Sequence, residues 1–343
     1  MDGLAASRTA PLSRSASARD TPQPFMTATA GYHVAQDQPR RQRMNLIALL
    51  FGIWIEQRLA SLLRLREPRW FDPYFDWGLR HLSGANAGQA LVMTALIGLL
   101  PVLPVAIIAW LFANKLLGIL YLAFSLVVLL FSLGPRNLAE DVEDYTRVLR
   151  EPDEQLRAQR AKAITERDAP TDPAERTRAI EDAIFVQANN RMFGVILWFM
   201  LLGPTGAWLF RVTDLMRRRA VFEGGRAREQ TGVTPDYVAA VQRVHGALAW
   251  LPARLLALGY ALAGSFEDAV SDWRAYYQHC SEHFFEVNDA VLACAGSGAL
   301  RNRAFAADVD AAQVVGGAMR LVNRTLIVWL TAIALLTVVG WAV

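Results

Sequence analysis

Four long apolar runs constrain the fold of this chain more than any other feature of its sequence. They cover residues 88–112, 116–134, 192–213 and 323–342. A helix of about 20 apolar residues can span the hydrocarbon core of a bilayer, and it bonds its backbone polar groups within itself, as a spanning segment must. No strand-like alternation of any length accompanies these runs. We therefore predict an all-α, multi-pass helical integral membrane protein, with helical loops on the cytoplasmic and periplasmic sides.

Two weaker apolar runs, at residues 45–63 and 247–264, each contain charged side chains. Glu56 and Arg58 interrupt the first run, and Arg254 lies inside the second. We predict that both are partial spans. The number of crossings, four or six, and the side of the charged segment 135–190 stay open, because the loop charges give conflicting signals under the positive-inside rule.

The first 43 residues differ in composition from the remainder. They are rich in Ser, Ala, Thr, Pro and Arg and show no apolar periodicity. Such a segment cannot bury enough apolar surface to offset the entropy of ordering. We predict a disordered extension over residues 1–43 and a helical membrane domain over residues 44–343.

Composition and motifs exclude several soluble functions. The formal net charge is +3 and Lys115 and Lys162 are the only lysines, so no lysine-dense patch for nucleic acid exists. No lysine follows a glycine-rich turn as in a P-loop, and no G-x-S-x-G motif is present. The partner that we expect from the residues is the lipid bilayer, with no nucleic acid.

Potential metal ligands are sparse. Cys280 and Cys294 form no C-x-x-C pair. His279, His283 and Glu286 share one face of a predicted helix, but they lack the glutamate that an H-E-x-x-H site needs next to its first histidine. We expect solvated helix surface there, no metal and no cofactor.

Polar side chains in or beside the apolar runs are the better indication of a site, because such groups are costly in hydrocarbon and are usually functional. They can form structural ion pairs at helix ends, or they can line a binding pocket, and the sequence leaves both open. We expect no catalytic residue among them. The candidates are Glu56, Arg58, Asn189, Asn190, Arg191, Arg211, Asp214 and Arg254.

Three stretches carry a resemblance to a known family: "AIEDAIFVQANNRMFG", "LWFMLLGPTGAWLFR" and "LPARLLALGYALAG". Over residues 44–343 the chain resembles the membrane superfamily that contains the cobalamin-pathway CobD/CbiB synthases and the AmpE proteins. The spacing of Asn189, Arg191 and Phe193 is similar to the AmpE pattern. The synthases have an acid before the asparagine and another before the glycine, whereas this chain has Asn189 and Phe193 there.

The AmpE resemblance implies an inner-membrane signalling modulator, linked to β-lactamase induction and cell-wall sensing. It implies a location in the bacterial inner membrane, a possible protein partner in cell-wall recycling signalling, and no catalysis. The alternative is a membrane enzyme related to adenosylcobinamide-phosphate synthase, which would form an amide with ATP and magnesium. Such an enzyme needs carboxylates, because magnesium prefers hard oxygen ligands.

Overall fold

The computed structural model describes residues 44–54, 71–82, 86–113, 118–133, 138–231, 235–279, 287–304 and 310–339. Within these ranges every regular element is a helix, so the prediction of an all-α fold is confirmed. The ranges belong to one compact unit, residues 39–343. The predictions for residues 1–43, for Glu56 and Arg58, and for the ligating side chains of His279, His283 and Glu286 concern groups outside the described part of the chain.

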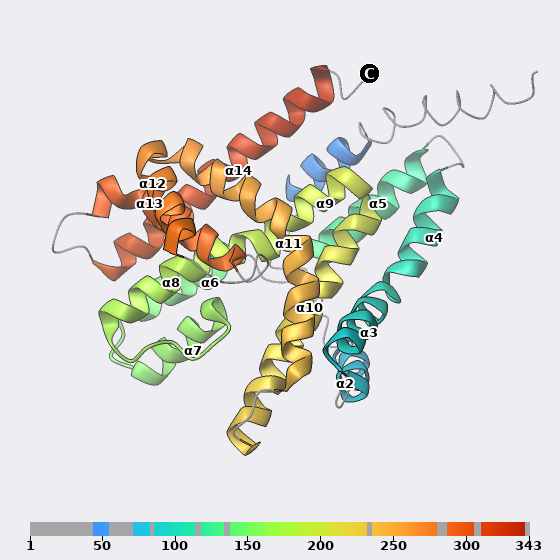
Figure 1. Cartoon of the computed structure of the whole chain (residues 1–343). Helices are drawn as coiled ribbons and strands as arrows, with labels where there is room; N and C mark the ends of the chain where they lie inside the picture. Colours follow the sequence, from blue (N-terminus) through green and yellow to red (C-terminus); the bar gives the residue numbers. More distant parts are fainter. Residues whose placement is uncertain are drawn as a thin grey trace, which may run out of the picture. The chain divides into compact units, whose positions relative to one another are not determined.

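Figure 1 shows the described helices, coloured along the sequence. A short helix, Met44–Trp54, comes first. The labelled elements are α2 (Asp72–Leu82), α3 (Ala87–Leu99), α4 (Val102–Ala113), α5 (Ile119–Leu133), α6 (Leu138–Val148), α7 (Glu154–Thr165), α8 (Pro173–Ala188), a π-helical turn (Asn189–Phe193), α9 (Gly194–Leu202), α10 (Pro204–Thr231), α11 (Asp236–Ala263), α12 (Phe266–His279), α13 (Asn288–Ala304) and α14 (Ala311–Val339).

Within the part of the chain that the structure describes, four stretches are long and apolar enough to cross a membrane: Ile119–Val148, Pro173–Leu202, Asp236–Ala263 and Ala311–Thr337. A fifth candidate is the pair α3 and α4, which bend by 42° at their junction. This junction contains Pro101, which has no backbone N–H to donate to the preceding helical turn and whose ring clashes with that turn. The partial span expected at residues 247–264 corresponds to the second half of α11, which begins earlier, at Asp236, and ends at Ala263.

The run predicted as one span at residues 192–213 is divided in the structure. Gly203 has a φ of +66°, a left-handed conformation that favours glycine. Pro204 then begins α10, where its missing N–H costs no helical hydrogen bond. The chain reverses there and α10 packs against α9 (Figure 1). The apolar character of the run therefore reflects two packed helices and not one crossing.

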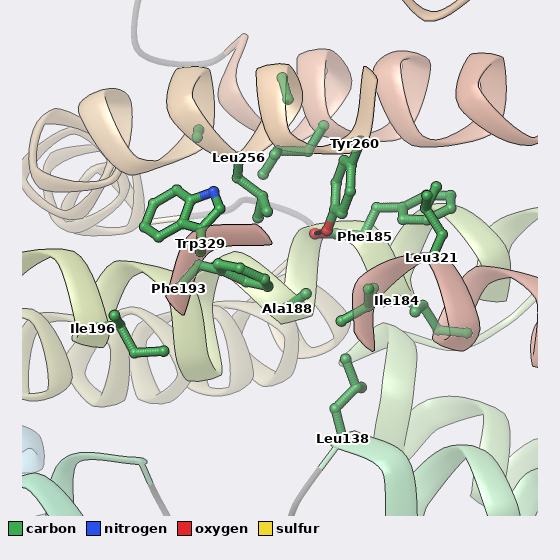
Figure 2. Close-up of a cluster of buried hydrophobic side chains, with 14 of the residues drawn as sticks. Leu138, Ile184, Phe185, Ala188, Phe193, Ile196, Leu256, Tyr260, Leu321 and Trp329 are labelled. Carbon is green, nitrogen blue, oxygen red and sulfur yellow. Dashed lines mark hydrogen bonds between the residues drawn. The ribbon is translucent and has the colours of Figure 1, made fainter. Parts of the chain in front are cut away.

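The hydrophobic core surrounds the π-helical turn (Figure 2). The Phe193 ring packs edge-on against Trp329 of α14, with 5.1 Å between the ring centroids. On the preceding helix the Phe185 carbonyl accepts a hydrogen bond of 3.0 Å from the Tyr260 hydroxyl of α11. Because α8, α11 and α14 all meet here, the backbone of the turn is fixed by buried contacts on several sides.

Close packing at the end of this turn gives a first prediction. A Cβ on Gly194 would lie 2.2 Å from the Phe210 ring, whereas a Cβ on Gly225 of α10 would meet nothing within 4 Å. We expect Gly194→Ala to destabilise the protein by about 1–3 kcal/mol through overpacking. Gly225→Ala should be neutral or slightly stabilising, since alanine is the better helix former. Thermal unfolding in detergent, followed by tryptophan fluorescence, compares the two, and equal midpoints would show that the contact is not tight.

Candidate functional site

The π-helical turn places a run of polar side chains inside the protein. The Gly194 N–H donates to the Asn189 carbonyl, which is the five-residue spacing of a π-helix. Asn189, Asn190 and Arg191 are all buried. One-turn π-bulges often occur at functional sites, because the wider turn re-aims side chains that an α-helix would direct elsewhere.

Asp214 of α10 is the centre of the charged part of the site. Its carboxylate is fully buried and pairs with three guanidinium groups of its own helix. The N–O distances are 3.3 Å to Arg211, 2.8 Å to Arg217 and 3.2 Å to Arg218. Spacings of three and four residues put these side chains on one face of α10. Burial favours the protonated acid, but the arginines outweigh it and hold the pKa of Asp214 below its usual value.

Glu166 joins α7 to this centre. It ends α7 in the left-handed region, with a φ of 58°, a conformation that costs a non-glycine residue roughly 1–2 kcal/mol. Its carboxylate lies 2.9 Å from both Arg217 and Arg218. Burial would raise the pKa of Glu166, yet the two guanidinium groups lower it to about 2. Glu166 is therefore ionised at any physiological pH, and its strained backbone is held by ion pairs.

Arg191 extends the site to α6. Its guanidinium donates to the Asp141 carboxylate at 2.6 Å and to the Ala163 carbonyl at 3.0 Å. It also donates to Gln187 Oε1 at 3.2 Å, and the same oxygen accepts from Arg218 at 3.3 Å. Gln187 thus links the two charged groups into one set of contacts. We call this set the arginine–carboxylate network: Asp141, Glu166, Gln187, Arg191, Arg211, Asp214, Arg217 and Arg218.

An uncharged hydrogen-bond chain lies against the network. His245 of α11 contacts Asn190 Oδ1 through Nε2 at 3.4 Å and the Thr213 hydroxyl through Nδ1 at 3.3 Å. Asn189 Nδ2 donates to the same Asn190 oxygen at 3.5 Å. The buried imidazole therefore connects the π-helical turn to α10.

Arg254 lies in a separate group on α11. Its guanidinium is bonded to Asn288 Oδ1 and lies over the Trp250 ring, 5.5 Å from the centroid. Asn288 in turn donates to the Gly246 carbonyl at 2.8 Å, one residue from His245. This arrangement joins α13 to α11 beside the site.

The structure brings together five of the eight candidate residues predicted from the sequence. Asn189, Asn190, Arg191, Arg211 and Asp214 lie in or against the network, and Arg254 lies in the neighbouring group. Glu56 and Arg58 are outside the described residues. The site also contains groups that sequence reasoning did not select: Asp141, Glu166, Gln187, Thr213, Arg217, Arg218 and His245.

A sequence signal existed for some of these missed residues. Asp141 lies on the face of α6 that Leu138, Val142 and Tyr145 bury, and an acid on an apolar helix face requires a partner. Arg217 and Arg218 follow an apolar run, and arginines at such a position usually indicate the cytoplasmic side of a membrane. Glu166 had no local signal, since its partners are about fifty positions away in the sequence.

A pocket of about 380 Å³ opens beside the network. Glu166, Gln187 and Arg217 of the network line it, together with Asp289 of α13. Loss of hydration raises the pKa of the Asp289 carboxyl, an effect that Arg217 and Arg167 oppose. The volume lies in the range of small-molecule sites, and charged groups of both signs line it.

The described residues of the site do not form a metal-binding site by themselves. Among the described residues, no group of three or more His, Cys, Asp or Glu side chains is arranged to hold a metal ion. The carboxylates of Asp141, Glu166 and Asp214 are all engaged by arginines.

The fold and site define a helical membrane protein with a buried charged network next to a small-molecule pocket. The CobD/Cbib protein family matches residues 49–305, which include every residue of the network, and the chain belongs to this family. A cobalamin biosynthesis protein CobD of Chromobacterium violaceum is 28% identical over 243 residues, covering 66% of this chain and 74% of the relative. A second, from Stutzerimonas stutzeri, is 29% identical over 202 residues and covers 59% and 62%, less than two thirds of that protein. No solved structure matches.

These matches confirm the superfamily expected from the sequence and correct two further expectations. The prediction that the chain is not an enzyme is wrong, because the chain belongs to the CobD/Cbib protein family and both curated relatives are cobalamin biosynthesis proteins CobD. The matches also give no support to the AmpE subtype. That prediction depended on two acids missing beside Asn189 and Gly194. In the structure, Asp141 of α6 pairs with Arg191 of the turn, and Glu166 and Asp214 pair with Arg217 of α10.

Proposed function

We propose that this chain is a bacterial inner-membrane enzyme of cobalamin biosynthesis that forms an amide from a carboxylate and an amine with ATP, in the manner of the adenosylcobinamide-phosphate synthases. The observation that carries the proposal is the family match over residues 49–305, which contains the whole network and the pocket beside it.

The charges of the site suit anionic substrates. The network holds four guanidinium groups, of Arg191, Arg211, Arg217 and Arg218, and three carboxylates, of Asp141, Glu166 and Asp214, a formal surplus of one positive charge. Arginine presents a planar array of donors that matches carboxylate and phosphate oxygens. The paired carboxylates hold these donors in place before a substrate arrives, which reduces the reorganisation that binding requires.

The proposed reaction also needs a site with limited water. In amide formation the amine nitrogen attacks an acyl carbon that has been activated by a phosphate. The carbon–oxygen bond to the phosphate breaks, the phosphate leaves with the bonding electrons, and the nitrogen gives up one proton. Water competes with the amine for the activated carbon, so a pocket walled by packed helices favours the amide. ATP, accompanied by magnesium, enters this scheme as a substrate.

Complementation in cells tests the proposal. A bacterium that lacks its own CobD-family gene and needs endogenous cobalamin should grow when it expresses this chain. Arg217→Lys keeps the positive charge but loses the fork that reaches both Glu166 and Asp214, so we expect growth to fail at normal membrane abundance. The matched control is Arg226→Lys on the same helix, whose side chain is 58% exposed and pairs weakly at 3.7 Å. Absence of growth with abundant wild-type protein would contradict the proposal.

A further inference from the structure

Four carboxylates among the described residues line the pocket beside the network, and three of them already have a partner. Glu166 pairs with Arg217 at 2.9 Å, Asp168 pairs with Lys162 at 2.7 Å, and Asp182 accepts a hydrogen bond of 3.2 Å from Ser297. Asp289 is the fourth. Its carboxylate forms no hydrogen bond or ion pair with any residue that the structure describes. Of these four carboxylates, Asp289 is therefore the one that a ligand can engage without displacing a described partner.

The position of Asp289 is fixed by its neighbour in the chain. Asp289 lies in the first turn of α13. Asn288, the preceding residue, donates a hydrogen bond of 2.8 Å to the Gly246 carbonyl and is bonded to Arg254, so the start of α13 is held against α11. Asp289 itself is exposed, and it lines the pocket. A molecule in the pocket can thus reach a carboxylate whose backbone is already held in place.

The surroundings of Asp289 make its carboxylate a stronger base than an aspartate in water. Loss of hydration raises the pKa of Asp289, and Arg217 and Arg167 oppose this effect. The carboxylates of Glu166 and Asp214 raise the pKa further, so the net change is upward. A base is more effective as its pKa approaches the working pH. The charged groups that face Asp289 from the α7–α8 connection, α8 and α10 are Glu166, Arg167, Asp168, Asp182, Asp214 and Arg217.

We propose that Asp289 binds the amino group of the amine substrate and accepts one proton from it before the amide bond forms. This inference rests on the proposed amide-forming reaction. An amine is an ammonium cation in neutral water, and an unpaired carboxylate is a matching partner for it. The acid and the phosphates are anions, which Asp289 repels and the guanidinium groups of the network attract. Among the three substrates, the amine is therefore the one that suits Asp289.

The proton transfer has a defined place in the reaction. An ammonium nitrogen has no lone pair, so it cannot attack carbon. Transfer of one of its protons to a carboxylate oxygen of Asp289 leaves a neutral amine with a free lone pair. The nitrogen then attacks the activated acyl carbon, the carbon–oxygen bond to the phosphate breaks, and the proton that the nitrogen releases in this step goes to the leaving phosphate. Asp289 returns its own proton to water after the product leaves.

Two measurements on the full-length protein in detergent test the binding and the proton transfer separately. The first is calorimetric titration with the phosphorylated amine alone. We expect Asp289→Asn to weaken binding about tenfold, the effect of one lost charge-assisted hydrogen bond. The second is amide synthesis with all substrates, in which the same variant should lose about 100-fold in kcat. The KM values for the acid and ATP should stay within about twofold. Glu229→Gln, which changes an exposed acid of α10, is the control and should alter neither result.

Rescue and pH dependence separate this role from a structural one, since an acid in the first turn of a helix also interacts favourably with the helix dipole. Formate should restore part of the rate of Asp289→Ala, because it supplies the missing carboxylate. In the wild type, kcat/KM for the amine should fall as the pH drops through the raised pKa of Asp289, which lies above the ordinary value of about 4. Asp289→Asn should lack this fall.

Unchanged amine binding in Asp289→Asn, or amide synthesis that does not depend on Asp289, would overturn the inference and leave the proposed function intact. The same holds for a loss of rate that formate does not restore and that follows the amount of folded protein. Amine binding that depends on Asp289, in a wild-type protein that forms no amide, would instead refute the proposed reaction. The two failures are therefore distinguishable.

Discussion

Asp214→Asn should remove most of the folded protein from the membrane. Asparagine has nearly the shape of aspartate, but it cannot neutralise the guanidinium groups of Arg211, Arg217 and Arg218, which would remain close together around a buried position. Removing one partner of a buried ion pair costs about 3–5 kcal/mol. In detergent we expect the thermal midpoint to fall by at least about 6 °C, given about 2–4 °C per kcal/mol for a chain of this order of size.

A second acid on the same helix provides the control. Glu223 also pairs with two arginines, Arg219 and Arg226, but its side chain is 26% exposed. Pairs that reach solvent are worth about 0–1 kcal/mol. Glu223→Gln should therefore leave the midpoint nearly unchanged. Equal effects of the two substitutions would show that the Asp214 carboxylate is not the buried centre of the network.

The Arg191–Asp141 pair should show strong coupling in a double-mutant cycle. Arg191→Met leaves the Asp141 carboxylate buried without its 2.6 Å partner, and Asp141→Leu leaves the guanidinium unpaired. Each single change should cost about 3–5 kcal/mol, whereas the double variant should recover much of that loss, because a buried ion pair can be replaced by apolar groups at little net cost. The measurement is the thermal midpoint of the four proteins in one detergent.

Stability and function should separate in this double variant. Gln187 and Ala163 also bond to the Arg191 guanidinium, so methionine there removes contacts that orient the turn. We expect the double variant to be stable and abundant yet unable to support cobalamin-dependent growth. If the losses of stability in the two single variants were additive in the double variant, the two side chains would not be directly coupled. Normal growth of cells with the double variant would show that Arg191 is not needed for function.

Much of the fold was predictable because apolar periodicity is a local property. The runs at residues 88–112 and 116–134 correspond to α3, α4 and α5, whose bounds follow from residues within each helix. The reversal inside the run at 192–213 was visible as a Gly-Pro-Thr-Gly break, but its extent was not. The reversal depends on the left-handed φ of Gly203, which is a local property of the chain. It also depends on the helices against which α10 packs, which is a tertiary property that a local pattern does not contain.

The sequence predicted those site residues that are polar but lie in or beside an apolar run. Asn189, Arg191, Arg211 and Asp214 stood out because each lies beside residues that belong in an apolar environment. Glu166 did not, since it ends a polar helix, and its pairing with Arg217 and Arg218 depends on the tertiary fold. His245 was equally inconspicuous within α11, because a single histidine in an apolar helix is usually a packed core residue.

The largest error came from treating a motif position as if it were a chemical requirement. The acids that the synthases have next to Asn189 and Gly194 are absent here, and the prediction of no catalysis depended on this absence. Asp141 of α6 and Asp214 of α10 bring carboxylates to the network from distant sequence positions, and each is paired with arginine there. The match over residues 49–305 shows that the chain belongs to the CobD/Cbib protein family although these two acids are absent.

Direct synthesis of the product is the measurement that tests the central claim. Membranes containing the wild-type chain would be supplied with ATP, magnesium, the corrinoid acid and the phosphorylated amine, and the amide would be followed by mass spectrometry. The account predicts an amide whose formation requires ATP and is lost in Arg217→Lys but kept in Arg226→Lys. Folded, membrane-inserted wild-type protein that forms no amide, or forms it equally without ATP, would contradict the account.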